Sequence, residues 1–109
     1  MKKLLTVSIL IMAACSVVIF AYANDIKKET MGEELFNEHC VMCHPDGGNI
    51  INPEMTLHKK ELNEHKLTKP GDIIAFMRNP GPGMPSFDKE KIPDEFAEKI
   101  AEYILNKFN

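Results

Sequence analysis

The sequence predicts a small all-α protein, and three observations lead to that class. Apolar residues recur at helical spacing near the carboxyl terminus, at Phe96, Ile100, Tyr103, Ile104 and Phe108. No segment has the alternating or β-branched pattern of a strand. Clusters of glycine and proline at residues 45–49 and 80–85 separate the helical segments. We therefore expect about four helices and no sheet.

The first 23 residues have the three parts of an export signal. Lys2 and Lys3 form a short basic region, residues 4–20 are apolar and uncharged, and Ala21-Tyr22-Ala23 is a cleavage site of the A-x-A type. We expect residues 1–23 to be removed and residues 24–109 to form one domain in the periplasm. The apolar stretch approaches the length of a membrane span, so an uncleaved anchor is an alternative.

A second processing route starts from Cys15. Met12-Ala13-Ala14-Cys15 resembles a bacterial lipobox, which would put a lipid on Cys15 and anchor the protein at the outer membrane, facing the periplasm. The residues after Cys15 remain apolar, whereas lipoproteins usually turn polar there. Ordinary cleavage is therefore favoured.

The first helix of the domain is expected from Lys28 to His44. Gly32 inside it costs about 1 kcal/mol relative to alanine, so it needs a structural reason. A close crossing with another helix would provide that reason.

The end of this helix carries a motif with a specific chemistry. Cys40-Val41-Met42-Cys43-His44 spells C-x-x-C-H, the signature of covalent attachment of c-type haem. Two thiols at this spacing can add to the two vinyl groups of one porphyrin, and the adjacent histidine can then bind the iron. We predict one haem c, held by Cys40 and Cys43, with His44 as an axial ligand.

Zinc sites and thiol-redox sites also contain C-x-x-C. Structural zinc usually requires a second cysteine pair, and the only other cysteine of the chain is Cys15 in the export signal. A thioredoxin-like site follows a buried strand, whereas residues 32–39 are typical of a helix. Haem attachment is favoured, and export agrees with it, because c-type haem is attached outside the bacterial cytoplasm.

The elements after the motif follow from turn residues and apolar spacing. The turn cluster 45–49 stops the first helix, and the apolar residues 50–53 are expected to lie against the haem edge. A short polar helix is predicted from Thr56 to about Glu64. A buried helix follows, with Thr68 as its N-cap and its end near residues 78–79. The last helix is predicted from Pro93, at its first position, to about Phe108.

Met84 is predicted to be the second axial ligand. It lies forty residues beyond His44, in a segment (80–87) with three prolines and two glycines. Proline fixes φ, so this loop is irregular but stiff and can hold a thioether at a fixed distance from the iron. Core packing is the usual role of the other methionines of residues 24–109, which are Met31, Met42, Met55 and Met77. A bis-histidine site using His58 or His65 is the main alternative, although both histidines have charged neighbours typical of a solvated surface.

Charge and side-chain chemistry exclude several function classes. The chain has 13 Lys and Arg against 16 Asp and Glu, and haem propionates would make it more acidic, which argues against nucleic acid as a partner. No nucleophile is paired with a base, so we expect no enzymatic activity. We expect a monomer whose partners are redox proteins, such as other cytochromes or a terminal reductase or oxidase.

On these residues, the sequence resembles class I c-type cytochromes, and most closely the cytochrome c6-like monohaem cytochromes. The resemblance rests on the C-x-x-C-H motif, on Gly32 with Phe36, and on residues 82–87, which are similar to the methionine loop of that family. It covers nearly all of residues 28–108 and extends to c6-like proteins of metal-reducing bacteria, some of them held at the outer membrane. It implies a small class I cytochrome c fold wrapped around one haem, with His44 and Met84 as axial ligands.

We therefore expect an exported one-electron carrier in a periplasmic respiratory or extracellular electron-transfer chain. His44 and Met84 would fill both axial positions, so that no substrate reaches the iron. The alternative is a haem-based sensor or ligand-switching protein, in which Met84 dissociates and a gas or another group binds.

Overall fold

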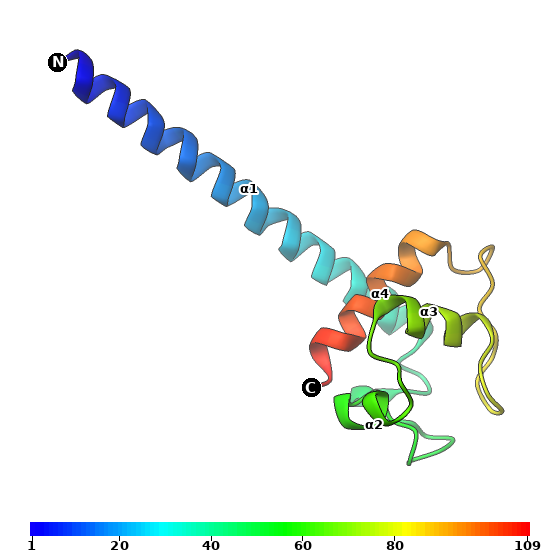
Figure 1. The fold of residues 1–109 in the computed structure, drawn as a ribbon. Coiled ribbons are helices and arrows are strands. Elements are labelled where there is room, and N and C mark those ends of the chain that lie inside the picture. Colours follow the sequence, from blue (N-terminus) through cyan, green and yellow to red (C-terminus); the bar gives the residue numbers. More distant parts are fainter.

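The computed structural model describes all 109 residues, and its regular elements are all helices, as predicted (Figure 1). Its elements, in chain order, are α1 (Lys2–His39), the 3-10 turn η1 (Pro45–Gly47), α2 (Lys59–Glu64), α3 (Pro70–Arg78) and α4 (Asp94–Lys107). The end of α1 packs with α2, α3 and α4 into a small domain. The rest of α1 projects from this domain as one long rod.

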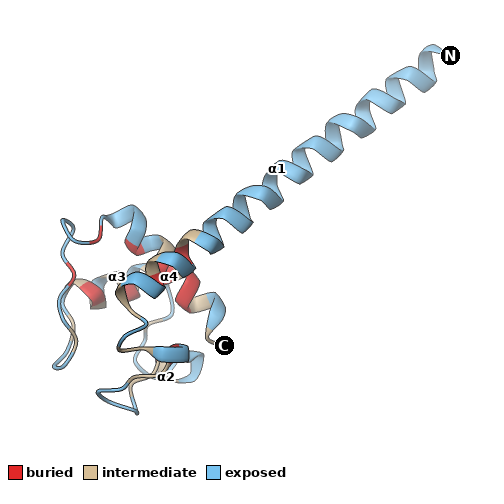
Figure 2. Ribbon diagram, turned by 180° about the vertical axis from the view of Figure 1, so that it is seen from behind, coloured by how far each residue is buried: buried red, intermediate tan, exposed pale blue.

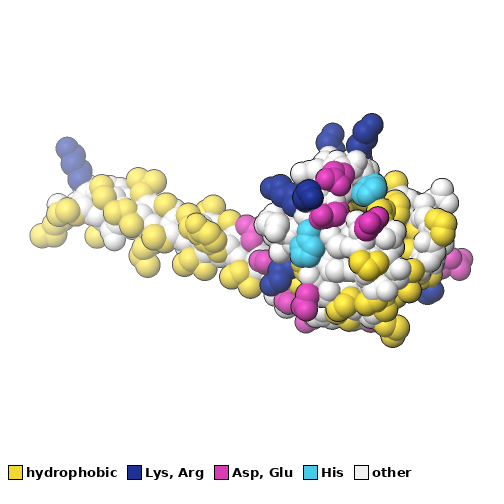
Figure 3. Space-filling model, turned by 90° about the horizontal axis from the view of Figure 1, so that it is seen from below, with side chains coloured by type: hydrophobic (Ala, Val, Ile, Leu, Met, Phe, Trp, Pro, Cys, Tyr) yellow, Lys and Arg dark blue, Asp and Glu magenta, His cyan; other side chains and the backbone are white.

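The projecting part of α1 is exposed, and near the domain its Lys28 pairs with Glu102 of α4 at 2.7 Å. Residues 1–30 are exposed, and only Gly32 and Phe36 of this helix are buried (Figure 2). Hydrophobic side chains cover the rod, and basic side chains mark its far end (Figure 3). By length and composition α1 could cross a membrane, and a signal sequence near the amino terminus meets the same criteria.

The first helix ends at His39, and the prediction that it continues to His44 was wrong. The N–H groups of Cys40 and Val41 both donate to the carbonyl of Phe36, at 2.8 and 3.0 Å, so the chain leaves the α-helical path there. The N–H groups of Cys43 and His44 then both donate to the Cys40 carbonyl, at 3.1 and 2.9 Å. The C-x-x-C-H motif therefore forms a separate turn after the helix.

The close helix crossing predicted from Gly32 is confirmed, and the partner of α1 is α4. A Cβ atom on Gly32 would lie 2.6 Å from the carbonyl oxygen of Lys99 and 2.8 Å from the Cβ of Tyr103. One turn further along α1, the Phe36 ring packs against the rings of Tyr103 and Phe108, each with a centroid distance of 5.4 Å. Because only glycine allows this approach, Gly32 fixes how the two helices meet.

The two short helices begin later than predicted. α2 starts at Lys59 instead of Thr56, because the Thr56 hydroxyl accepts the N–H of His58 at 3.3 Å and donates to Glu61 at 3.2 Å, which makes residues 56–58 a turn.

The N-cap of α3 is Lys69, so the prediction of Thr68 was wrong. The Asp72 carboxylate accepts the N–H groups of Thr68 and Lys69, at 3.2 and 3.0 Å. The cap is thus supplied from inside the helix. The end of α3, at Arg78, agrees with the prediction.

α4 is one residue shorter at each end than predicted, with Pro93 as the N-cap instead of the first helical residue. Its buried stripe includes Ile100, Tyr103 and Ile104, as expected, but not Phe96, which is 39% exposed. Ala97 and Ala101 are fully buried instead. Small residues occupy that face because other segments of the chain pack closely against it.

Candidate functional site

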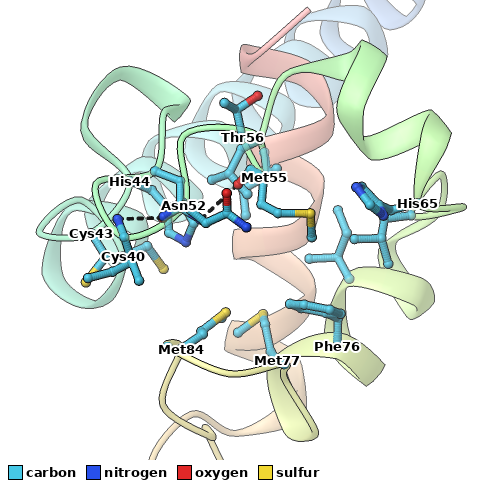
Figure 4. A pocket seen from close by; sticks show the side chains of 18 of the residues that line it. Cys40, Cys43, His44, Asn52, Met55, Thr56, His65, Phe76, Met77 and Met84 are labelled. Carbon is cyan, nitrogen blue, oxygen red and sulfur yellow. Dashed lines mark hydrogen bonds between the residues drawn. The ribbon is translucent and has the colours of Figure 1, made fainter.

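The predicted site residues meet at one cavity. It has a volume of about 290 Å³ and lies between residues 39–57, α2, α3 and the loop 80–87, and its wall is mostly apolar. Cys40, Cys43, His44 and Met84 all line it (Figure 4). Residues that are far apart in the sequence are therefore brought to one apolar space, as a buried porphyrin requires.

The imidazole of His44 is held by one backbone contact. Its Nδ1 lies 2.8 Å from the carbonyl oxygen of Gly48, which can only accept, so Nδ1 carries the proton. This leaves the lone pair on Nε2 free for a metal, the arrangement in which a second hydrogen bond fixes the tautomer of a histidine ligand.

The turn that carries this contact depends on Gly47. Its φ is +77°, and a Cβ there would lie 2.5 Å from the ring of Phe108. Glycine adopts such a φ without strain, and it leaves the space that the Phe108 ring needs. The chain therefore turns directly after His44, which brings the Gly48 carbonyl back to the imidazole.

The Cys40 thiol does not have the lowered pKa of a reactive thiol. Burial, followed by the neighbouring Cys43, raises the pKa of the Cys40 thiol to about 12. Thiols that work in redox exchange or metal binding have lowered pKa values. In addition, no group of three or more His, Cys, Asp or Glu side chains is arranged to hold a metal ion. Both observations argue against the zinc and thiol-redox interpretations of the motif.

Three methionines line the cavity, and their positions differ. Met84 is half-buried in its loop and faces the cavity from the side opposite His44 (Figure 4). Met77 is 4% exposed and belongs to the core on α3. Met55 enters from the same side as His44. Because the two axial ligands of one iron must lie on opposite faces of the porphyrin, Met84 is the best placed. Met31 and Met42 do not line the cavity.

His58 and His65 are both exposed, as their charged neighbours predicted. His65 nevertheless lines the cavity, and so does His39. His58 instead packs edge-on against the ring of Phe108, with a centroid distance of 6.1 Å. The bis-histidine alternative is thereby reduced to His65.

Asn49 organises one wall of the cavity, a role that the sequence analysis missed. Its Oδ1 accepts the N–H groups of Ile51 and Asn52, both at 2.9 Å, and its Nδ2 donates to the Met55 carbonyl at 2.9 Å. The Gly-Gly-Asn cluster was the available signal, because asparagine side chains commonly bond the backbone two residues further on. Of the predicted apolar loop, Ile51 lines the cavity, whereas Ile50 does not.

The methionine loop rests on this same wall. Gly83 has a φ of +91°, and a Cβ there would lie 2.9 Å from Cγ2 of Ile51. The loop therefore approaches the 49–55 wall at the residue directly before Met84.

Asp94, at the start of α4, is charged and paired. Its carboxylate accepts hydrogen bonds from Lys89 at 2.7 Å and from Arg78 at 2.9 Å. The hydrogen bond from Lys89, and then that from Arg78, lower the pKa of Asp94. A carboxyl group whose pKa is lower in the folded chain than in the unfolded chain stabilises the fold above its unfolded pKa, and this stabilisation is lost as the pH falls through its folded pKa.

We therefore expect Asp94→Asn to reduce the free energy of unfolding at pH 7 by a small amount, because the carboxyl group is exposed. The difference from the wild type should disappear as the pH falls below about 4, near the ordinary pKa of an aspartate. Denaturant unfolding at a series of pH values measures it. Glu95→Gln is the matched control, since it removes a neighbouring negative charge that no side chain pairs. Identical pH profiles for the two variants would contradict the expectation.

Comparisons with known proteins agree with this geometry. The family model described as cytochrome c oxidase, cbb3-type, subunit III matches residues 27–104. Cytochrome c6 from Gracilaria tenuistipitata var. liui is 37% identical over 76 residues, which are 70% of this chain and 69% of that protein. Cytochrome c6 from Gloeothece citriformis is 34% identical over 109 residues, 98% of this chain and 96% of that protein.

A solved structure is similar as well. OmcF, the outer membrane cytochrome F from Geobacter sulfurreducens, is 45% identical, with a TM-score of 0.70, and the match covers 72% of this chain and 99% of that one. Fold and site together define a class I c-type cytochrome. Within that class, the chain belongs to the cytochrome c6-like monohaem cytochromes. It is a monohaem electron carrier with one covalently bound haem c, and cytochromes of this kind act with redox partners.

Proposed function

We propose that Cys40 and Cys43 hold the haem through thioether bonds and that His44 and Met84 are its axial ligands. The observation that supports this most is the meeting of all four side chains at one cavity, with His44 and Met84 on opposite sides of it. The bound haem supplies an iron that exchanges one electron between its ferric and ferrous states.

The residues of the chain set the conditions for that exchange. The Gly48 carbonyl accepts a hydrogen bond from the Nδ1–H of His44, which orients the ring and makes Nε2 a more basic ligand. The thioether of Met84 favours a high reduction potential, and the apolar wall acts in the same direction by keeping water from the site. Because two side chains would fill the axial positions, electron transfer is favoured over substrate chemistry.

We also propose that residues 1–23 are removed and that residues 24–109 act, as a monomer, in a periplasmic respiratory or extracellular electron-transfer chain. Other cytochromes, or a terminal reductase or oxidase, would be the partners. The exposure of Ala21, Tyr22 and Ala23 supports cleavage, because a peptidase needs access to that segment. OmcF is described as an outer membrane cytochrome, which supports a lipid anchor on Cys15 as the alternative.

Intact mass spectrometry tests this proposal on protein that is made together with the haem-attachment machinery. We expect the mass of residues 24–109 plus one haem, and absorption spectra in both redox states that include the weak band reporting an iron–sulfur bond. A mass of the trimmed polypeptide alone contradicts covalent attachment. An added lipid mass that is lost in Cys15→Ser would replace cleavage after Ala23 by the lipid anchor.

A further inference from the structure

The side chain of Arg78, at the end of α3, joins three parts of the domain. Its Nη1 donates to the carbonyls of Phe87 at 2.8 Å and Asp88 at 3.0 Å, both in the segment after the methionine loop. Its Nη2 donates to Asp94 at the start of α4, at 2.9 Å. Only 19% of the side chain is exposed. The guanidinium is thus folded against the loop, where it bonds backbone carbonyls directly.

The same segment is also attached to backbone carbonyls of α3. The Ser86 hydroxyl donates to the Arg78 carbonyl at 2.7 Å, and the Phe87 N–H donates to the Met77 carbonyl at 3.0 Å. The last carbonyls of a helix lack partners within the helix, so these bonds complete the end of α3. Residues 86–88 are therefore fixed both by α3 backbone groups and by the Arg78 side chain.

Met84 lies two residues before this attachment. The loop leaves α3 at Asn79 and returns to it at Ser86, so it is closed at both ends. Three prolines between these points limit the φ angles available to it, and Gly83 is pressed against Ile51. Met84 therefore lies in a loop that is attached to α3 at both ends, and the attachment at residues 86–88 is the nearer of the two.

The Ser86 and Phe87 bonds attach two adjacent residues to the last carbonyls of α3. The two bonds from Nη1 of Arg78, to the carbonyls of Phe87 and Asp88, extend this attachment by one residue and add a charged donor to it. Hydrogen bonds from a charged donor are also the stronger kind.

We propose that Arg78 is a positioning residue, which keeps the Met84 thioether turned into the cavity and so closes the sixth position of the iron to outside ligands. The inference rests on the proposed function, because it requires Met84 to be the axial ligand. It adds that the closure depends on a side chain that does not itself line the cavity.

The test is the rate at which free imidazole binds to the ferric holoprotein, followed by loss of the iron–sulfur band, with denaturant unfolding measured in parallel. We expect Arg78→Gln to bind imidazole about tenfold faster or more, since it loses hydrogen bonds from a charged donor. Arg78→Lys should lie between, because an ammonium group keeps the charge but lacks the planar group whose Nη1 bonds both carbonyls while its Nη2 bonds Asp94. Asp94→Asn is the matched control and should remain close to the wild type, because both carbonyl bonds persist.

Three results would overturn the inference. An unchanged imidazole rate in Arg78→Gln, together with a lower free energy of unfolding, would make Arg78 a purely structural residue. If Arg78→Gln does not fold, an unchanged rate in Arg78→Lys would have the same meaning. A rate in Asp94→Asn as fast as that of Arg78→Gln would assign the effect to the ion pair. A wild-type holoprotein without the iron–sulfur band would instead contradict the ligand assignment, and the inference with it.

Discussion

Met84→His is expected to keep the haem attached, to abolish the iron–sulfur band and to lower the reduction potential by on the order of 100 mV or more. A thioether favours ferrous iron, whereas a second imidazole favours ferric iron, so the exchange of one for the other lowers the potential. Because Cys40, Cys43 and His44 are unchanged, the loss should be confined to one axial position.

A spectroelectrochemical titration of the purified holoprotein measures both effects. Met55→Leu is the matched control, because Met55 lines the same cavity but enters it from the side of His44 (Figure 4). We expect its band and potential to stay close to those of the wild type. Loss of the band in Met55→Leu, with the band intact in Met84→His, would transfer the ligand role to Met55.

Gly32→Ala is expected to lower the free energy of unfolding by about 2 kcal/mol or more, at the upper end of what overpacking usually costs. The added methyl group would lie 2.6 Å from the Lys99 carbonyl oxygen and 2.8 Å from the Tyr103 Cβ, neither of which a side-chain rotation can move away. α1 and α4 would have to separate, and the Phe36 contacts with Tyr103 would loosen with them. The helix propensity of alanine recovers only about 1 kcal/mol.

Guanidinium chloride unfolding of the holoprotein measures this loss. Gly71→Ala is the matched control, because Gly71 lies in α3 and a Cβ there would meet no atom within 4 Å. The control should be neutral or stabilising by up to about 1 kcal/mol. Equal stability of the two alanine variants would mean that the helix crossing does not depend on Gly32.

The parts of the fold that could be predicted from the sequence are those decided by a single residue type. Gly32 predicted a close helix crossing, because an unfavourable residue inside a helix needs a reason. The proline-rich segment 80–87 predicted an irregular, stiff loop. The end of α1 could not be predicted in the same way, because residues 40–44 are acceptable in a helix. The position at which α1 ends depends on which carbonyl accepts the N–H groups of Cys40 and Val41.

The buried face of α4 is a second feature that could not be predicted fully from the sequence. Hydrophobicity favours Phe96 as a core residue over Ala97, yet Ala97 is fully buried and Phe96 is 39% exposed. The choice depends on how much space the neighbouring segments leave, and no property of α4 alone carries that information.

The residues of the candidate site also differ in how far the sequence could predict them. Local chemistry predicted Cys40, Cys43, His44 and Met84, because a motif and a proline-rich loop are readable without a fold. Of the residues that support them, Asn49 had a local signal, because it bonds the backbone two and three residues further on. Arg78 could not be predicted, since it bonds backbone carbonyls at positions that only the folded chain defines.

The direction in which α1 leaves the domain has a consequence for encounters with other proteins. The rod departs on one side, whereas α2 and the loop 80–87 lie on the other (Figure 1). A tether at the amino end would thus leave α2 and the loop 80–87, which line the cavity, on the side away from the tether. The face formed by α2 and the loop 80–87 would be open to a partner both before and after the amino-terminal segment is cleaved. Cleavage would therefore change the location of the protein but not the surface through which it binds a partner.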